Sequence, residues 1–526
     1  MTKLGLFLRI ILVISFATLV ARLAELQIVK GEYFKNLSDG NRVRYISTSA
    51  PRGNILARDG TIIAGNVEIK KRIKFDPNLG YTKSPLNSDD EKNKISFDEI
   101  LSEWSRSYPF GADAAPIIGY VNEAGVDEVG KVDPNCLGKN AKKLGSNLGK
   151  TGLEYQYDCP LRGIDGEELI EVDSMGKMVR ILGSKNPIKG TDIKTTIDIN
   201  LQKAVAKAMK GYKGAVVVQS PRGEILSIFS SPSFDPYNPA HSIVDENLPL
   251  FNRAISGNYH PGSPFKIVTA IAALEDQKIN TDYKYDDVGY IKVNEYEYNN
   301  WYFSEYGGKE GEIGLIKGLA RSTDTLFYKL GEFLGPDRLS FWARNFGYGA
   351  KTGIDLPGES ESLVPDSQWK LKTKGENWYL GNSYHFAIGQ GDLTATPLQV
   401  NSMMATIAAA GEKCTPHINS DIQEKCTKMS IGDESRNEVL QGLIAACKKG
   451  GTGVPFFEYP IPVACKTGTA ETGGESEPHA WFTIFAPVES PQIVLTVLVE
   501  KGGEGSKVAA PIAKKILDSY FVKVNP

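Results

Sequence analysis

The chain has 526 residues, of which 41% are hydrophobic and 23% are charged, and 60 Lys and Arg against 63 Asp and Glu give a formal net charge of −3. This length accommodates about three or four domains with a large buried core, and the composition excludes disordered, collagen-like and small disulfide-stapled proteins. The balanced charge lacks the basic footprint of a nucleic-acid-binding protein, so we expect no nucleic-acid partner.

An apolar stretch at the start of the chain changes the expected compartment. Residues 4–21 are apolar except for Arg9 and a few small hydroxyl residues, which is close to the length that a membrane-spanning helix needs. Lys3 and Arg9 favour a cytoplasmic N-terminus. We therefore expect a single-pass protein of the cytoplasmic membrane, anchored by residues 1–24, with its catalytic domain on the outer (periplasmic or extracellular) side. A cleaved signal peptide is the alternative, with a site at Ser15-Phe16-Ala17.

The next region, residues 25–190, is predicted to form a β-rich stalk module. Its first part, residues 25–66, has the pattern of a short helix followed by extended segments. Alternating apolar and polar residues indicate a strand around 168–172. Residues 67–150 are polar and rich in Gly, Asn and Lys, and they carry little chemical information.

Residues 191–526 are predicted to form one α+β domain, an antiparallel sheet flanked by helices. Four apolar segments have the pattern of strands and follow one another as two hairpins: 215–218 with 225–228, and 480–485 with 493–498. Apolar residues spaced by four between Val508 and Tyr520 indicate a closing helix.

The six cysteines are an even number in a chain expected to face an oxidising exterior. Cys136 with Cys159, and Cys414 with Cys426, lie close enough in sequence to close short loops. Six cysteines allow 15 connectivities, and spacing does not choose between them. The remaining two, Cys447 and Cys465, are either paired or buried free thiols.

The segment Ser263-Pro264-Phe265-Lys266 opens a helical stretch with a possible nucleophile. The spacing puts the hydroxyl and the amine on one helix face, where the amine can take the hydroxyl proton, and a helix N-terminus favours negative charge. The S-x-x-K pattern alone is weak, because residues 174–177 and 367–370 repeat it. We interpret these two repeats as surface coincidences.

Two further short motifs follow in chain order. Ser322-Thr323-Asp324 begins a helical run and, taken alone, would be read as a helix cap. Lys466-Thr467-Gly468 follows an apolar segment on a predicted strand, whereas Lys351-Thr352-Gly353 lies in a Gly-rich loop. The ordered set of S-x-x-K, S-x-D or S-x-N, and K-T-G is the signature of penicillin-binding proteins and active-site serine β-lactamases.

The chain resembles the class B penicillin-binding proteins, the monofunctional D,D-transpeptidases of peptidoglycan synthesis, apart from about residues 67–150. Further segments carry this resemblance: Pro51-Arg52-Gly53, Arg58-Asp59-Gly60, Gly152-Leu153-Glu154, Thr196-Ile197-Asp198 and His479-Ala480-Trp481-Phe482. Residues 346–349, 352–359 and 388–391 are similar to the elongation-specific type, penicillin-binding protein 2. The resemblance implies the transpeptidase fold, shared with serine β-lactamases, after a membrane helix and a dimerisation-type pedestal module.

The resemblance also implies an activity in cell-wall elongation: cross-linking of stem peptides that end in D-Ala-D-Ala, with inhibition by β-lactams. Ser263 would attack the peptide to give an acyl-enzyme, with Lys266 as the general base. Ser322 would relay the proton to the leaving amine, and Asp324 would hold Lys266 in register. An amine from a neighbouring strand would then resolve the acyl-enzyme.

The K-T-G segment and its successor are implied to bind the substrate. Lys466 and Thr467 would hold its terminal carboxylate, with Gly468 and Thr469 completing this part of the site. Backbone N–H groups of Ser263 and Thr469 would form the oxyanion hole. One departure is that Cys465 stands where the family usually has Gly.

No cofactor is implied, and we expect no metal site. Some elongation-type relatives carry zinc after the S-x-x-K helix, but residues 268–413 here contain no Cys and only one His, His385. The implied macromolecular partner is a membrane glycosyltransferase of the shape, elongation, division and sporulation family. Three alternatives stay open: a division-specific transpeptidase, a β-lactam-hydrolysing or β-lactam-sensing relative, and a scaffold that activates a membrane glycosyltransferase.

Overall fold

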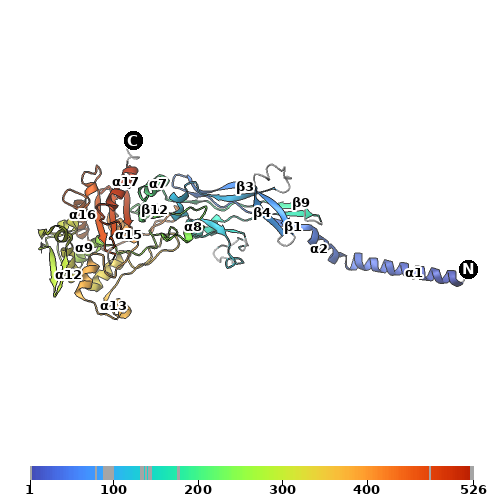
Figure 1. Ribbon diagram of the computed structural model, residues 1–526, viewed down its shortest axis with the longest axis horizontal. Helices are drawn as coiled ribbons and strands as arrows, with labels where there is room; N and C mark the ends of the chain where they lie inside the picture. The colour runs from blue at the N-terminus through green and yellow to red at the C-terminus, as the bar shows by residue number, and fades with distance from the viewer. Residues whose placement is uncertain are drawn as a thin grey trace.

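The computed structural model describes residues 3–76, 80–86, 100–130, 136, 139, 142, 145–173, 178–472 and 476–521. The molecule is elongated, with a single helix at one end, a β-rich module in the middle and a large mixed domain at the other end (Figure 1). The predicted fold class, an α+β transpeptidase domain preceded by an apolar helix and a β-rich pedestal, is confirmed.

Helix α1 (Lys3–Ala24) projects away from the rest of the protein (Figure 1). None of its described residues is buried against protein. It continues through a π-helical turn (Glu25–Val29) into α2 (Gly31–Arg42). An apolar helix of this length, with its side chains free of protein contacts, has the properties of a membrane anchor.

The pedestal is built on two sheets whose strands come from both ends of the module. The first sheet is antiparallel with order β1-β8-β9, formed by β1 (Val43–Thr48), β8 (Gly166–Val172) and β9 (Met178–Lys185). The second has order β10-β2-β3-β4, with β5 also on β3, and consists of β2 (Ile55–Leu56), β3 (Ile62–Asp76), β4 (Gly80–Pro85), β5 (Ile100–Ser107) and β10 (Ile193–Lys194). Strand β10 lies just beyond the predicted module boundary at residue 190. Strand β8 confirms the strand predicted around 168–172.

The remaining pedestal elements are short: a 3₁₀ turn (Gly111–Asp113), α4 (Ala115–Ile118), β6 (Val121–Glu123), β7 (Asn147–Gly149), α5 (Gly152–Gln156) and α6 (Asp158–Leu161). A buried ion-pair network joins them to the sheets. Glu154 is fully buried and pairs with Arg52 at 2.9 Å and with Arg106 at 2.6 Å, and Arg52 also pairs with Asp158 at 2.9 Å. The Pro-Arg-Gly and Gly-Leu-Glu motifs therefore contact each other through one buried carboxylate.

The large domain contains a five-stranded antiparallel sheet with order β12-β11-β21-β20-β19. Its strands are β11 (Gly214–Gln219), β12 (Ile225–Ser231), β19 (Ala464–Ala470), β20 (His479–Ala486) and β21 (Ile493–Val499). The pairs β11–β12 and β20–β21 confirm both predicted hairpins. Strand β19, which carries the K-T-G segment, lies at the edge of the sheet.

Helices cover both faces of this sheet. On one face α7 (Ile199–Ala208) and α17 (Ala509–Phe521) pack against Phe482 and Ile484 of β20. Trp481 and Phe485 point to the opposite core, as the period of two in a strand requires. The helix α15 (Pro397–Ala408) packs on that second face. Helix α17 confirms the predicted closing helix.

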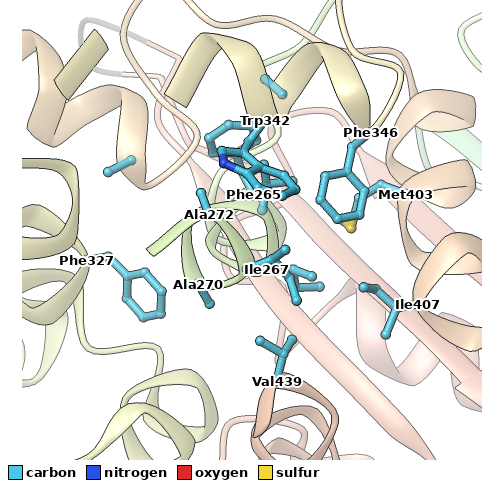
Figure 2. Close-up of a cluster of buried hydrophobic side chains, with 14 of the residues drawn as sticks. Phe265, Ile267, Ala270, Ala272, Phe327, Trp342, Phe346, Met403, Ile407 and Val439 are labelled. Atoms are coloured by element: carbon cyan, nitrogen blue, oxygen red, sulfur yellow. The ribbon is translucent and has the colours of Figure 1, made fainter. Parts of the chain in front are cut away.

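Helix α9 (Lys266–Glu275) lies in the middle of the second core. Every residue from Lys266 to Leu274 is buried, so this helix has no solvent-facing side. Figure 2 shows Ile267 and Ala270 of α9 among side chains of α12 (Asp324–Asn345), α15 and α16 (Asp433–Ala446). This packing fixes α9, and with it the residues at its N-terminal end.

The other elements of the domain are short helices and two-stranded sheets: α8 (Ala240–Ile243), β13 (Tyr285–Asp287), β14 (Tyr290–Val293), β15 (Tyr296–Asn299), α10 (Trp301–Tyr306), β16 (Gly311–Ile313), α11 (Leu315–Arg321), α13 (Ser367–Lys374), α14 (Leu380–Ala387), β17 (Glu412–Cys414), β18 (Cys426–Lys428) and a 3₁₀ turn (Val454–Phe456). The disulfides are Cys136–Cys159, Cys414–Cys426 and Cys447–Cys465. The third bridge resolves the alternative between a disulfide and free thiols in favour of the disulfide.

Candidate active site

Ser263 lies in a 3₁₀ turn (Ser263–Phe265) that leads directly into α9, so Lys266 is the first residue of that helix. The preceding residue, Gly262, has a φ of 61°, which glycine adopts readily. Its N–H donates to the carbonyl of Gly389 at 2.9 Å, and a Cβ on Gly389 would lie 2.2 Å from the Gly262 carbonyl oxygen. The Gly-Gln-Gly segment (389–391) therefore supports the backbone immediately before Ser263.

The same turn packs against strand β19. A Cβ on Gly468 would lie 2.5 Å from the Pro264 ring, and a Cβ on Gly262 would lie 3.3 Å from the carbonyl oxygen of Thr469. The backbone segments that carry Ser263 and Thr469, predicted to form the oxyanion hole, are therefore neighbours.

Ser322 occupies the turn between α11 and α12. It has φ 58° and ψ 38°, the left-handed conformation, which costs a non-glycine residue roughly 1–2 kcal/mol. Such strain persists only where the surroundings hold it, and it is typical of functional sites. Ser322 is buried, and its conformation directs the hydroxyl into a cluster of polar side chains.

Four predicted site residues meet at the Ser322 hydroxyl. It accepts hydrogen bonds from Lys266 Nζ at 3.1 Å and from Lys466 Nζ at 2.8 Å, and it donates to Ser263 Oγ at 3.0 Å. A serine hydroxyl has one proton and two lone pairs, so these three contacts use its full capacity. Asp324 completes the cluster, with Oδ1 accepting from Lys266 Nζ at 2.7 Å.

The two lysines lie in a cluster with one carboxylate. Lys266 and Lys466 are both fully buried, and Asp324 forms an ion pair with Lys266. Burial lowers the pKa of Lys266, while Asp324 opposes this change. Burial and the neighbouring Lys266 lower the pKa of Lys466 well below its ordinary value. Burial therefore favours the neutral form of both amines, and the Asp324 carboxylate opposes this change.

A residue that the sequence did not indicate contacts the K-T-G segment. Thr467 Oγ1 donates to Thr452 Oγ1 at 2.7 Å. Thr452 lies in the loop after α16, and the Cys447–Cys465 disulfide joins the end of α16 to β19 next to Lys466. A single threonine in a Gly-rich segment has no spacing pattern that would single it out.

The repeats of the S-x-x-K and K-T-G patterns that the structure describes lie outside this polar cluster. Lys351-Thr352-Gly353 lies outside the regular elements, where Thr352 donates to Glu359 through its N–H and hydroxyl. The S-x-x-K repeat at 367–370 lies on α13, and its interpretation as a surface coincidence was wrong for Lys370. That lysine is 4% exposed and donates to Asn382 at 2.8 Å, which gives it a structural role. The repeat at 174–177 lies outside the described residues.

Two families match the chain. Residues 214–518 match the penicillin binding protein transpeptidase domain, and residues 88–195 match the penicillin-binding protein dimerisation domain. The peptidoglycan D,D-transpeptidase MrdA of Acinetobacter baumannii is 30% identical over 602 residues, which cover 98% of this chain and 87% of the relative.

Solved structures are similar along almost the whole chain. The complex between penicillin-binding protein PBP2 and MreC from Helicobacter pylori gives a TM-score of 0.78 at 26% identity, covering 92% of this chain and 99% of the matched chain. A structure on the coordination of polymerization and crosslinking by a peptidoglycan synthase complex gives a TM-score of 0.75 at 28% identity, covering 99% and 98%. With these matches, the chain belongs to the class B penicillin-binding proteins and is an elongation-type peptidoglycan D,D-transpeptidase.

Proposed function

We propose that Ser263 is the nucleophile of this transpeptidase and attacks the penultimate D-Ala carbonyl of a stem peptide. The C–N bond to the terminal D-Ala breaks, an ester forms on Ser263 Oγ, and an amine from a neighbouring strand later takes the acyl group. The observation that carries this proposal is the convergence of Ser263, Lys266 and Lys466 on one hydroxyl, within 3.1 Å of Ser322 Oγ.

Lys266 acts as the general base after it has lost its proton. The substrate's terminal carboxylate binds beside Lys466 and raises the pKa of that lysine. In this proposal Lys266 starts protonated beside Asp324 and Lys466 starts neutral. The Ser322 hydroxyl turns from Ser263 toward Lys466 and gives Lys466 its proton, and Ser322 takes a proton from Lys266. The net change moves one proton from Lys266 to Lys466, so substrate binding itself produces the neutral base.

The proton of Ser263 then passes to Lys266, one helical turn away, and reaches the leaving amine through Ser322. Asp324 keeps Lys266 in place at 2.7 Å throughout. The N–H groups of Ser263 and Thr469 stabilise the oxyanion of the tetrahedral intermediate. The contact of the Ser263 turn with β19 supports this assignment.

The carboxylate subsite consists of Lys466 and Thr467, with Gly468 and Thr469 forming the adjoining backbone. The edge position of β19 supports this role, because an edge strand leaves backbone groups free to pair with an extended peptide. Thr452 holds the Thr467 side chain in place by accepting the hydrogen bond from its hydroxyl.

Labelling the full chain with a fluorescent penicillin, followed by peptide mass spectrometry, tests the nucleophile. We expect a long-lived adduct on Ser263 that is missing in Ser263→Ala. Rapid turnover of the drug would indicate a β-lactamase. A folded protein without an adduct would instead favour a scaffold that activates a glycosyltransferase.

The apolar helix and the matched structures support a proposal for the membrane topology and the partners. We propose that Lys3 and Arg9 lie on the cytoplasmic side, with the pedestal (25–190) and the transpeptidase domain (191–526) outside. The matched synthase complex and the MreC complex support two partners, a membrane glycosyltransferase of the shape, elongation, division and sporulation family and a protein of the MreC type. Co-purification of the full chain with each candidate, with and without residues 1–24, tests both the partners and the anchor.

A further inference from the structure

A small lobe between α9 and α11, residues 285–313, contacts both ends of the Ser322 turn. It comprises β13, β14, β15, α10 and β16. Its core is polar and is built around one carboxylate, that of Asp287, at the end of β13. We call residues 285–313 the clamp lobe.

The Asp287 carboxylate is fully buried and accepts hydrogen bonds from several neutral donors. Oδ1 accepts from the N–H of Gly289 at 3.0 Å, from Asn300 Nδ2 at 2.9 Å and from Thr325 Oγ1 at 2.6 Å. Oδ2 accepts from Asn300 Nδ2 at 2.8 Å and from the N–H of Glu310 at 2.9 Å. A buried carboxylate is costly unless its lone pairs are satisfied, so this network holds its donors firmly.

One of these donors belongs to the active-site helix. Thr325 is fully buried and follows Asp324, whose carboxylate holds Lys266. The bond from Thr325 to Asp287 therefore fixes the start of α12 from outside the polar cluster.

The other end of the turn is held by aromatic residues of the clamp lobe. Trp301 Nε1 donates to the carbonyl of Arg321 at 2.8 Å, immediately before Ser322. The Arg321 guanidinium lies 5.0 Å from the Trp301 ring and 5.2 Å from the Tyr302 ring, and it pairs with Glu310 at 2.7 Å.

We infer that the clamp lobe holds the strained left-handed turn at Ser322, with Asp287, Trp301 and Thr325 acting as positioning residues for acylation. The inference rests on the proposed role of Ser322, whose hydroxyl must reach three groups at once. A misplacement of about 1 Å in such a network is enough to cost roughly a hundredfold in rate. Strain of this kind relaxes unless both flanks are fixed, and the clamp lobe fixes both.

Thr325→Val gives the sharpest test, because it keeps the shape of the side chain and removes only the hydroxyl that reaches Asp287. We expect the maximal acylation rate of the full chain with a fluorescent penicillin to fall about ten- to hundredfold, with the preceding binding constant changed less than threefold. Thr325→Ser keeps the hydroxyl and should restore the rate. Trp301→Phe removes one hydrogen bond and should therefore lower the same rate about fivefold.

Asp286→Asn is the matched control, because Asp286 is an exposed carboxylate next to Asp287. The inference is overturned if Thr325→Val and Trp301→Phe acylate within twofold of the unchanged protein while Ser322→Ala loses activity. It is also overturned if Thr325→Ser is as slow as Thr325→Val, or if Asp286→Asn is equally slow. If Ser322→Ala itself acylates normally, the proposed function of Ser322 fails, and this inference fails with it.

Discussion

The Ser322 hydroxyl is the junction of the proposed proton path, and Ser322→Ala removes it. Contacts of 2.8, 3.0 and 3.1 Å to Lys466, Ser263 and Lys266 are lost together. General acid–base assistance is worth about a hundred- to ten-thousandfold, so we expect acylation by penicillin to slow by that factor. This loss corresponds to about 3–5 kcal/mol of activation free energy.

The cost to stability should be much smaller than the cost to catalysis. Lys266 keeps two acceptors in Ser322→Ala, the Ser322 backbone carbonyl at 2.8 Å and Asp324 at 2.7 Å. Lys466 keeps the carbonyl of Thr467 at 3.0 Å. We therefore expect the free energy of unfolding to fall by only about 1–2 kcal/mol.

Stopped-flow fluorescence with a penicillin reporter measures the acylation rate, and thermal unfolding measures stability. Thr323→Val is the matched control, because the Thr323 hydroxyl is buried and has no hydrogen-bond partner among the described residues. Its acylation rate should stay within about twofold. Acylation by Ser322→Ala within threefold of the unchanged protein, or an equal loss in Thr323→Val, would refute the proton path.

Four further predictions concern the pH dependence of rate and of stability, the disulfide and the glycine loop. Because the proposed path needs one proton on the Lys266–Lys466 pair, the acylation rate should rise with pH as the pair loses its second proton and fall as it loses the last one, and an activity profile over roughly pH 5–10 checks this. Between the lowered pKa values and the ordinary lysine pKa, the folded state binds fewer protons than the unfolded state. These lysines should therefore make the free energy of unfolding rise with pH in that window, which denaturant titrations measure. Replacing Cys447 and Cys465 by Ser opens a loop with a sequence separation of 18 and should cost about 3 kcal/mol, seen as a melting temperature lower by roughly 4 °C; an unchanged value would contradict the bridge. Gly389→Ala should reduce penicillin labelling strongly, because its Cβ would lie 2.2 Å from a backbone oxygen, and full labelling would argue against the support of the nucleophile turn.

Much of the architecture was predictable because its signals are local. Continuous apolar segments predicted both hairpins of the large sheet, since strands that are covered on both faces are apolar at successive positions. The three motifs were recognisable by residue type, spacing and order, and this was enough to indicate the family. The burial of a single side chain was less predictable, as Lys370 illustrates. Its spacing to Ser367 is visible in the sequence, but its burial depends on packing around Asn382.

The amino-acid sequence by itself determined which chemical groups are available, which segments form strands and helices, and in what order the motifs occur. Only the tertiary structure decided that Lys466, 144 residues after Ser322, reaches the same hydroxyl as Lys266, and that Cys447 pairs with Cys465. It also decided that Ser322 adopts the left-handed conformation and that the Asp287 carboxylate accepts a hydrogen bond from Thr325. The physical reason is that propensity and periodicity act within one element, whereas a catalytic distance depends on how separate elements pack, and that is the result of burying one common core.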